Sequence, residues 1–460
     1  MTRVLALDIG TSSVRAVVHD ERARPVAGET AQTRYEPTHG HDGRAEFDAD
    51  HLVEATRDAL EQALGTERGV DAVGASCFWH GLLAVDEHGR ALTPLVTWRD
   101  TRSAEAADAL RALVDPDELH RRTGCFLHAS YWPAKLAWLR AEQPETFARA
   151  HRFVSFSDYL YERLLGSPAT SLSMASATGL LDQGTRRWDE DLLDVLGLTE
   201  DRLPPISDEP VEHDGRLWYP ALGDGACSNV GSGCTTADRA VLMVGTSGAF
   251  RTLHPQTGAE PRARLFLYRL DERTVVEGGA LSDGGNVYSW LERTLQLDGS
   301  SGIAAREPAA HGLTFLTLLG GERSPNWNAR ARGALAGLSF DTTAEDLLHA
   351  ALEGVAFRFA ELVDLMPEVR EVVAAGHALR VDSDWVQILA DVLERPLTVS
   401  GIDEASARGA AVVALERLGG EPEPAPLGRV VEPRAERFAA LREARSAQRE
   451  LYDAVVPPPI

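Results

Sequence analysis

The chain opens on an apolar run that is interrupted by one carboxylate and then by a turn of small polar residues. Val4–Ile9 is apolar apart from Asp8, the turn is Gly10–Ser13, and Val14–Val18 is apolar again apart from Arg15. Two short apolar runs separated by such a turn predict a β-hairpin, with Asp8 near the end of its first strand. Backbone N–H groups and hydroxyls in the turn suit a phosphate, and Asp8 could hold a divalent cation beside it. An ordinary hairpin with a solvated carboxylate explains this segment equally well.

A second apolar run with the same kind of turn lies about half a chain further on. Val241–Val244 is followed by Gly245–Ser247, and the next apolar stretch ends at Arg251. This second copy has no counterpart of Asp8. An internal repeat on this scale predicts a duplicated domain, in which each half offers one hairpin to a shared ligand.

Elsewhere, apolar residues recur with helical spacing in some segments and form short continuous runs in others. Strands interleaved with helices predict an α/β protein. We expect a first lobe over residues 1–235, a second lobe over 236–430, and a C-terminal helix and tail over 431–460. The predicted helices cover residues 49–64, 103–114, 134–149, 155–166, 284–296, 343–364, 382–394, 404–418 and 433–454, and further strands cover 70–76, 82–85, 249–254, 265–269 and 274–280.

Composition narrows the class of protein. A chain of 460 residues favours two domains. No uncharged apolar run reaches the roughly 18 residues of a membrane span, and a net charge of −24 disfavours nucleic acids and anionic membranes as partners. The four cysteines form no C-x-x-C pair, which disfavours zinc and redox motifs. So few cysteines are typical of the reducing cytosol, and we expect a cytoplasmic protein.

Lysine is almost absent, and this excludes some chemistry. Of the 46 basic residues only one, Lys135, is a lysine, and it does not stand in a Gly-Lys-Ser/Thr sequence. A Walker A loop and the lysine pattern of protein kinases are therefore excluded. Phosphate chemistry must use backbone N–H groups, hydroxyls, arginine and a metal ion. Packing of an amphipathic helix explains Lys135 as well as a functional constraint does.

Aromatic and charged residues gather after two of the predicted strands. Trp79 and His80 form the first group, and Trp98, Asp100 and Arg102 form the second. Indole faces stack on the C–H bonds of a sugar, carboxylates accept from its hydroxyls, and arginine can clamp an anion. The alternative is that both tryptophans belong to the core and that Arg102 is a surface charge at the start of a helix.

Three glycine-rich segments complete the candidate chemistry. Asp224 is the one carboxylate of Gly223–Gly233, where small residues let a ligand approach closely. There it could accept the proton of a hydroxyl that attacks phosphorus, or it could cap a tight turn. The glycines of residues 278–286 and 374–379 would let a base and ribose lie against the backbone, or serve plain turns.

The ordered set of these motifs resembles the FGGY carbohydrate kinases, which belong to the actin-like, ribonuclease H-like ATPase fold superfamily. The resemblance runs nearly end to end and includes Gly321–Trp327, and Gly333–Glu353 is similar to the long C-terminal signature of the family. It implies a two-lobed α/β fold, built from a duplicated domain with a cleft between the lobes. It also implies a kinase that uses ATP and Mg²⁺ to phosphorylate a small sugar or sugar acid.

The resemblance further implies a role for each matched residue. Asp224 would be the catalytic base and Asp8 would hold Mg²⁺. The substrate would lie near Trp79, His80, Asp100, Arg102 and Asp224. ATP would contact the residues of the two hairpins and of the later turns, namely Gly10, Thr11, Ser12, Arg15, Gly245, Thr246, Ser247, Gly279, Asn286, Gly376 and His377.

Within the family the chain is most similar to gluconokinases, for example in Pro94–Trp98 and Thr123–His128. This implies phosphorylation of gluconate to 6-phosphogluconate, and a carboxylate-bearing substrate would give Arg102 or His128 something to bind. Xylulokinases share much of the pattern. A kinase for xylulose, glycerol or another polyol is therefore an alternative, and so is a sugar- or nucleotide-binding protein without activity.

The chain departs from the family pattern at two places. Trp79 stands where a methionine is usual before the histidine of the sugar loop, and the turn at Gly376 has one glycine fewer than usual. The first departure places a bulkier face near the substrate, and the second changes the expected adenine contacts. Dimers are common in the family, which implies a possible homodimer, although no residue pattern in this chain indicates one.

Overall fold

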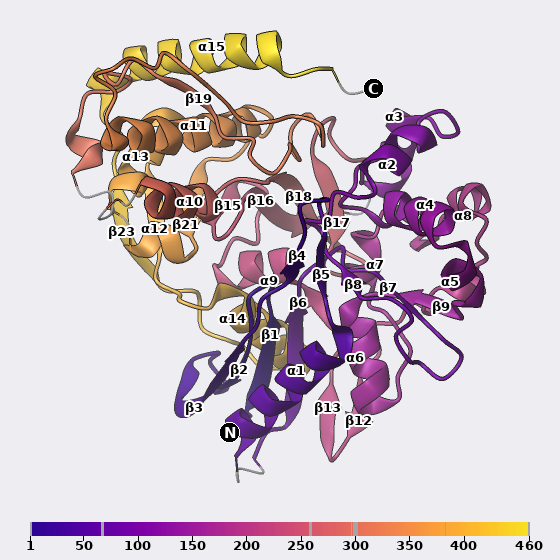
Figure 1. Ribbon diagram of the computed structural model, residues 1–460. Coiled ribbons are helices and arrows are strands. Elements are labelled where there is room, and N and C mark those ends of the chain that lie inside the picture. The colour runs from indigo at the N-terminus through magenta and orange to yellow at the C-terminus, as the bar shows by residue number, and fades with distance from the viewer. Residues whose placement is uncertain are drawn as a thin grey trace.

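The computed structural model describes residues 2–65, 69–256, 260–295, 297, 302–381 and 383–458. One of its two large sheets is seven-stranded and contains β1 (Val4–Ile9), β2 (Ser13–His19), β3 (Pro25–Arg34), β6 (Ala72–Cys77), β12 (Val211–His213), β13 (Arg216–Trp218) and β14 (Leu222–Gly223) (Figure 1). The strands follow the order β12-β13-β6-β1-β2-β3, and β14 also pairs with β6.

The second large sheet is built from the other half of the chain, in the order β17-β18-β16-β15-β21-β22-β23. Its strands are β15 (Arg239–Val244), β16 (Gly248–Pro255), β17 (Phe266–Arg269), β18 (Thr274–Leu281), β21 (Glu371–Ala375), β22 (Leu397–Ser400) and β23 (Leu427–Val431). Smaller sheets join β4 (Thr38–His39), β5 (Ala45–Phe47) and β8 (Leu95–Val96), then β7 (Leu83–Val85) and β9 (Arg152–Val154), β10 (Leu181–Asp182) and β11 (Arg187–Trp188), and β19 (Thr314–Leu316) and β20 (Ala334–Ala336).

Both large sheets repeat one design. In the first sheet, β1 pairs with β2 as an antiparallel hairpin and with β6 in parallel. In the second sheet, β15 pairs with β16 and with β21 in the same two ways. This shared arrangement of a hairpin and a parallel neighbour confirms the α/β fold with a duplicated domain that the two Gly-Thr-Ser turns predict.

Helices cover the sheets, and α15 spans the second lobe near the C-terminus (Figure 1). No helix in the described part of the chain is both long enough and apolar enough to cross a membrane. The helices are α1 (Ala49–Leu64), α2 (Ala104–Leu110), α3 (Pro116–Thr123), α4 (Trp132–Glu142), α5 (Pro144–Arg149), α6 (Phe156–Leu165), α7 (Leu172–Ser176), α8 (Glu190–Leu196), α9 (Asp224–Gly231), α10 (Gly285–Leu295), α11 (Ala344–Asp364), α12 (His377–Val381), α13 (Ser383–Leu393), α14 (Ala405–Arg417) and α15 (Phe438–Val455), with short 3₁₀ turns η1 (Glu200–Arg202), η2 (Ile303–Ala305) and η3 (Ala435–Arg437).

Helix α14 comes late in the chain but packs in the core of the first sheet. Its Ala407, Ala410 and Ala414 are buried in the same cluster as the side chains of β1 and β6. It crosses α9 so closely that a Cβ atom at Gly409 would overlap the backbone of Cys227. The packing therefore links residues across the expected lobe boundary near residue 235, and the boundaries along the sequence stay a prediction.

Several predicted elements differ from those of the structure. The predicted helix 134–149 is two helices, α4 and α5, which are separated at Gln143 because the following Pro144 disfavours helical backbone at the residue before it. The segment after Gly223 is a helix, α9, and not a loop. Two predicted helix ends, residues 296 and 382, lie outside the described residues.

Candidate active site

Three adjacent strands of the first sheet bring candidate residues to one edge. Strands β1, β6 and β14 run in parallel, with Asp8 opposite Ser76 and Gly223 opposite Cys77. The carboxyl ends of parallel strands meet at the same edge of a sheet. Asp8 therefore lies near the segment that follows β6 and near Asp224, which follows β14. This is the usual place for a ligand in an open α/β sheet.

The two carboxylates at this edge influence each other. Asp8 is 8% exposed. The pKa of Asp8 is raised to about 7, chiefly by burial; Arg15 acts in the opposite direction, and the negative charges of Glu404 and Asp224 contribute to the rise. Burial also raises the pKa of Asp224, against the positive charge of Arg251. A divalent cation would relieve the repulsion at Asp8, so the expected metal ligand fits its surroundings.

Asp224 begins α9 between two glycines that the local packing requires. A Cβ atom at Gly223 would overlap the ring of Trp79, and one at Gly225 would overlap both that ring and the guanidinium of Arg251. The glycines thus allow an indole and an arginine to lie against the start of the helix that carries Asp224. The sequence indicated close approach at this segment, and the structure identifies Trp79 and Arg251 as the groups that approach.

A cavity beside Asp224 contains some of the predicted residues and several that were not predicted. Trp79, His80, Asp224 and Ser247 line it as expected. Trp98, which the sequence singled out for its indole face, also lines it, and the residues that the sequence reasoning did not assign to the site include Met243, Arg251, Tyr268 and Arg323. Segments that follow strands of the first half of the chain and residues of the second large sheet therefore form one cavity, with Ser247 from the turn of the second hairpin among them.

His80 is held in a strained and neutral state. Its φ of 70° lies in the left-handed region, which is uncommon for a residue other than glycine. Nδ1 donates to the carbonyl oxygen of Ala177 at 2.8 Å, so Nε2 is the acceptor for Arg323 at 3.3 Å. Burial and the neighbouring Arg323 hold the pKa of His80 well below its usual range. Strain of this kind is often found in ligand sites.

Two buried guanidinium groups line the cavity, and the motif search missed both. Arg323 is 8% exposed and Arg251 is 7% exposed. Arg323 stacks over Trp98, with 5.1 Å from Cζ to the ring centroid. Among the described residues, Nε of each arginine has no hydrogen-bond partner. Their signal in the sequence was weak, because Arg251 ended a hairpin and Arg323 belonged to the family-like segment Gly321–Trp327.

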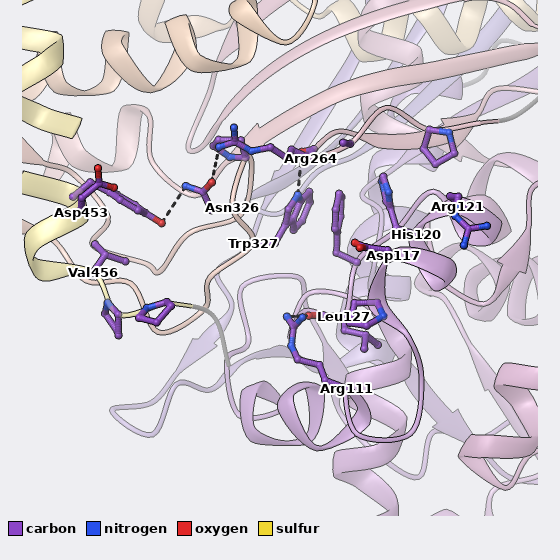
Figure 2. A pocket seen from close by; sticks show the side chains of 18 residues that line it. Arg111, Asp117, His120, Arg121, Leu127, Arg264, Asn326, Trp327, Asp453 and Val456 are labelled. Carbon is purple, nitrogen blue, oxygen red and sulfur yellow. Dashed lines mark hydrogen bonds between the residues drawn. The ribbon is translucent and has the colours of Figure 1, made fainter. Parts of the chain in front are cut away.

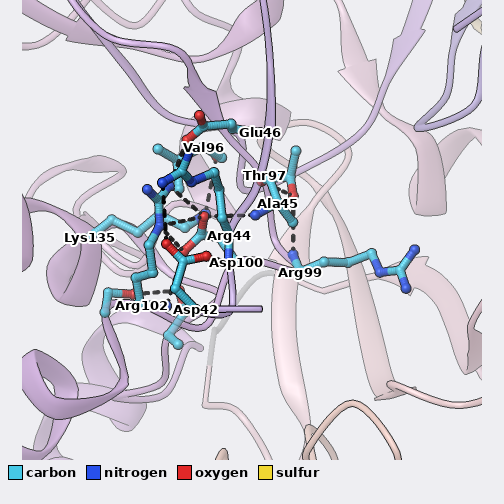
Figure 3. A network of polar contacts seen from close by, with 12 residues as sticks. Asp42, Arg44, Ala45, Glu46, Val96, Thr97, Arg99, Asp100, Arg102 and Lys135 are labelled. Carbon is cyan, nitrogen blue, oxygen red and sulfur yellow. Dashed lines mark hydrogen bonds and ion pairs between the residues drawn. The ribbon is translucent and has the colours of Figure 1, made fainter. Parts of the chain in front are cut away.

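Asp100 and Arg102 lie outside this cavity. Asp100 is 1% exposed and accepts from the backbone N–H of Ala45 at 3.0 Å. Arg102 donates to Asp100 and to Glu46, each at 2.7 Å from Nη2 (Figure 3). This closed ion-pair network satisfies both side chains, so it does not supply the anion clamp expected at Arg102. Trp98, which precedes them on the same segment, lines the cavity instead.

The second hairpin is fixed by backbone hydrogen bonds to the start of α10. The N–H of Asn286 donates to the carbonyl of Thr246 at 3.0 Å, and Asn286 Oδ1 accepts from the N–H groups of Gly284 and Val287. Asn286 therefore holds the turn that would face a phosphate. Gly279 does not belong to this turn. It lies inside β18, where a Cβ atom would overlap Leu362, so its role is packing.

The first hairpin and the turn after β21 meet near Glu404. Arg15 forms an ion pair with Glu404 at 3.1 Å between Nε and Oε1. Burial raises the pKa of the Glu404 carboxylate, and the neighbouring Arg15, Arg380 and His377 act in the opposite direction. Gly376 has a φ of 101° and turns the chain from β21 into the short helix α12, and His377 is exposed at the start of that helix. The predicted nucleotide residues Arg15 and His377 thus both lie near Glu404.

A buried group of metal-type side chains lies in the second lobe, away from Asp8. His311, His349 and Glu353 have their donor atoms within 4.8 Å of one another. Leu313 N–H donates to Nδ1 of His311 at 2.9 Å, so Nε2 of His311 carries the proton and donates to Glu353 at 3.1 Å. A protonated nitrogen is not a metal ligand. The group is therefore a hydrogen-bond network that ties α11 to the loop before β19.

A larger cavity, of about 860 Å³, lies on the other side of Trp327 (Figure 2). The rings of His120, Phe126 and Trp327 stack along it at centroid distances of 4.2 and 4.3 Å. Trp327 also faces Arg323, with 5.9 Å from Cζ to the ring centroid. Neither Asp8 nor Asp224 lines this cavity, so its size does not make it the reaction site.

A duplicated α/β fold, with a buried carboxylate and two buried arginines where its two halves meet, is typical of a two-domain phosphotransferase. Residues 3–210 match the N-terminal domain of the FGGY family of carbohydrate kinases, and residues 240–416 match its C-terminal domain. The chain belongs to the FGGY family of carbohydrate kinases. Kinases of this family use ATP as the phosphate donor, generally with Mg²⁺.

Relatives with three different substrate names are similar to this chain. The gluconokinase of Bacillus subtilis is 29% identical, over 90% of this chain and 88% of its own length. The xylulose kinase of Escherichia coli is 28% identical, over 98% of this chain and 99% of its own length. The glycerol kinase of Nitrobacter hamburgensis is 31% identical, over 92% of this chain and 91% of its own length.

Solved structures give the same result. The ligand-bound xylulose kinase and the gluconate kinase of Lactobacillus acidophilus each have a TM-score of 0.89 and 25% identity to this chain. Both alignments cover 99% of this chain and 98% of the other. These comparisons define a sugar kinase of the FGGY family, and they do not distinguish which sugar it phosphorylates.

Proposed function

We propose that this kinase transfers a phosphoryl group from ATP to a hydroxyl of a sugar acid, most simply gluconate, to give 6-phosphogluconate. The observation that supports a sugar acid as the substrate is the environment of Arg323. Its guanidinium is buried in the cavity, donates to neutral His80 at 3.3 Å, and has no partner at Nε among the described residues. A carboxylate satisfies a buried guanidinium better than a hydroxyl does. The similarity to the Bacillus subtilis gluconokinase supports the same substrate.

Asp224 is the proposed catalytic base. Burial raises its pKa, which increases its capacity to accept a proton, and the positive charge of Arg251 acts in the opposite direction by favouring the carboxylate form. The substrate hydroxyl gives its proton to the Asp224 carboxylate as its oxygen attacks the γ-phosphorus. The bond between that phosphorus and the bridging oxygen breaks, and ADP leaves with the bonding electron pair. Arg251 is close enough to stabilise negative charge that develops beside Asp224.

The ATP site is proposed from the two hairpins and the turns beside them. Gly10, Thr11 and Ser12 of the first hairpin and Gly245, Thr246 and Ser247 of the second offer backbone N–H groups to phosphates. Asp8 would hold Mg²⁺, which neutralises phosphate charge when bound. Arg15, Asn286, Gly376 and His377 are proposed to flank the nucleotide.

A xylulose or polyol kinase is the second candidate. The Lactobacillus acidophilus xylulose kinase is as similar in structure as the gluconate kinase, with the same TM-score of 0.89. The indole faces of Trp79 and Trp98 in the cavity would suit any sugar. The two candidates therefore differ chiefly in whether the substrate carries a carboxylate for Arg323.

An assay of ADP release across gluconate, xylulose, ribulose and glycerol tests the proposal. We expect the highest kcat/KM with gluconate. Arg323→Met should lower kcat/KM for gluconate by about 100-fold, because it removes the charge that pairs with the carboxylate, and it should lower the value for xylulose far less. The exposed Arg330, which pairs with Asp108 at 2.6 Å, provides the control variant Arg330→Met.

Three results would overturn the proposal. A higher kcat/KM with xylulose than with gluconate would assign the chain to the second candidate. Equal losses with both substrates in Arg323→Met would show that Arg323 does not read a carboxylate. Absence of transfer to every sugar tested, with folded protein and bound ATP, would favour a binding protein without activity.

A further inference from the structure

Lys135 is unusual in this chain, and the proposed mechanism does not use it. It is the single lysine among 46 basic residues. It lies on α4 and is 1% exposed, among the largest side chains that are fully buried. An ammonium is a compact charge with three donors, whereas the guanidinium of arginine is planar and larger. The buried site therefore favours the compact ammonium of lysine over the larger guanidinium of arginine.

The contacts of Lys135 lead to the substrate cavity. Nζ donates to the carbonyl oxygen of His80 at 2.6 Å and makes a longer contact with that of Val96 at 3.5 Å. Figure 3 shows the Lys135 side chain near Val96, beside the network of Asp100 and Arg102. Both acceptors are backbone carbonyls, so the ammonium holds the chain itself and not a side chain.

The two segments that Lys135 joins carry residues of the cavity. His80 has a backbone φ of 70°, a strained conformation that persists only where its surroundings determine it. Val96 ends β8 two residues before Trp98, and both His80 and Trp98 line the cavity with Asp224. One buried charge thus fixes the relative placement of a histidine and an indole from different loops.

We propose that Lys135 is a positioning residue that sets the affinity of the kinase for its sugar substrate, by holding the backbone beneath His80 and Trp98. The inference rests on the proposed cavity as the sugar site, but not on gluconate as the sugar. In the described structure Lys135 Nζ donates to His80 and Val96 and makes no hydrogen bond to either hairpin, β1–β2 or β15–β16. Loss of its ammonium should therefore raise KM for the sugar and leave KM for ATP nearly unchanged.

A pH dependence follows from the surroundings of Lys135. Burial lowers its pKa to about 7, Asp100 opposes this effect and Arg323 adds to it. The other charged groups that share its small pocket are Glu46 and Arg102. Because the pKa is lowered to about 7, the ammonium form predominates well below pH 7 and is lost as the pH rises through that value. A neutral amine is a weaker donor, so KM for the sugar should rise above about pH 7.

Three variants test the positioning role. Lys135→Met should raise KM for the sugar by about 10- to 100-fold, as loss of an orienting partner usually does. Lys135→Arg should give an intermediate KM without the rise above pH 7, because arginine stays charged. The control Arg140→Met removes an exposed cation from the same helix, where it donates to the carbonyl of Leu196 at 3.0 Å, and should leave KM unchanged.

A measurement on the wild type keeps the inference testable if Lys135→Met does not fold. Because the chain has one lysine, protein labelled with ¹³C-lysine gives NMR signals from a single lysine side chain. The sugar is unlabelled and does not contribute to them. The titration of this lysine should fall near pH 7 and should move when the sugar alone is added. A lysine signal that does not shift when the sugar is added would overturn the inference. A folded Lys135→Met protein with unchanged KM for the sugar would do the same.

The two proposals fail in different ways. The assays on Lys135 use whichever sugar the wild type phosphorylates fastest. If that sugar is xylulose, the proposed substrate is wrong and the positioning role can still be confirmed. If gluconate is the best substrate and the variants do not change its KM, the positioning role is wrong and the proposed function stands.

Discussion

At the scale of single residues, burial and neighbouring charge decide which groups can react. Asp8 and Asp224 are two carboxylates at one sheet edge, and each has a raised pKa. They differ in their partners, since Arg15 offsets burial at Asp8 and Arg251 does so at Asp224. Arg251, beside Asp224, also reaches the substrate cavity. This position suits the proposed reaction, because negative charge develops on the phosphoryl group while Asp224 accepts the proton.

Replacement of Asp224 tests its role as the base. We expect Asp224→Asn to lower kcat by about 10³-fold or more, because an amide cannot accept the hydroxyl proton. ATP should still bind, since the hairpins are intact, and calorimetry can measure that binding. The exposed Asp214, in the turn between β12 and β13, provides the control Asp214→Asn. Turnover close to wild type in Asp224→Asn would contradict the assignment.

At the scale of elements, the crossing of α9 and α14 holds the reactive carboxylate in place. Gly231 of α9 and Gly409 of α14 lie where a Cβ atom would overlap the backbone of the opposite helix. Ser406 of α14 donates to the carbonyl of Asp224 at 3.3 Å. The helix that begins at Asp224 is therefore supported by a helix encoded almost 200 residues later, and this support depends on close backbone contact.

Insertion of one methyl group should disrupt this crossing. In an isolated helix Gly→Ala stabilises by about 1 kcal/mol, but at Gly409 the methyl group would meet backbone atoms that have no room to move. Overpacking costs about 1–3 kcal/mol or more, so Gly409→Ala should lower the midpoint of chemical denaturation and reduce kcat. The control is Gly184→Ala, where the nearest atom is the flexible Asp182 carboxylate at 3.3 Å. A midpoint at or above that of the wild type would refute the prediction.

At the scale of the whole molecule, net charge acts against compactness. The chain carries −24 at pH 7, and like charges destabilise a compact state through self-repulsion. Salt screens this repulsion, with a Debye length that falls from about 10 Å at 0.1 M to about 3 Å at 1 M. Salt also weakens the surface ion pairs, but each of these contributes only about 0–1 kcal/mol.

Stability should therefore increase with salt. We expect the thermal midpoint to rise by several degrees between low salt and 1 M NaCl, at roughly 2 °C for each kcal/mol gained. The rise should shrink near pH 5, because the sequence pI is about 5.0 and little net charge is left there. Differential scanning calorimetry at both pH values provides the comparison. A midpoint that falls with salt at pH 7 would show that the ion pairs matter more than the repulsion.

Much of the fold could be predicted from local patterns. The two hairpins, α1 and α11 follow from apolar runs, turns and helical spacing that short segments contain in full. The break at Gln143 was missed because the amphipathic pattern continued across Pro144. Helix α9 was missed because glycine and serine weaken helix propensity, and tertiary packing, most extensively against α14, stabilises that helix.

The site could be predicted in part. The sequence by itself determined the paired turns, the absence of a lysine-based phosphate loop, and the carboxylates Asp8 and Asp224, since each depends on local residue types and spacing. Only the tertiary structure decided that Asp100 and Arg102 neutralise each other, that Gly279 serves packing, and that Arg251 and Arg323 reach the cavity. Such assignments depend on which distant segments share a low-dielectric space, because burial and through-space charge fix what an ionisable side chain can do.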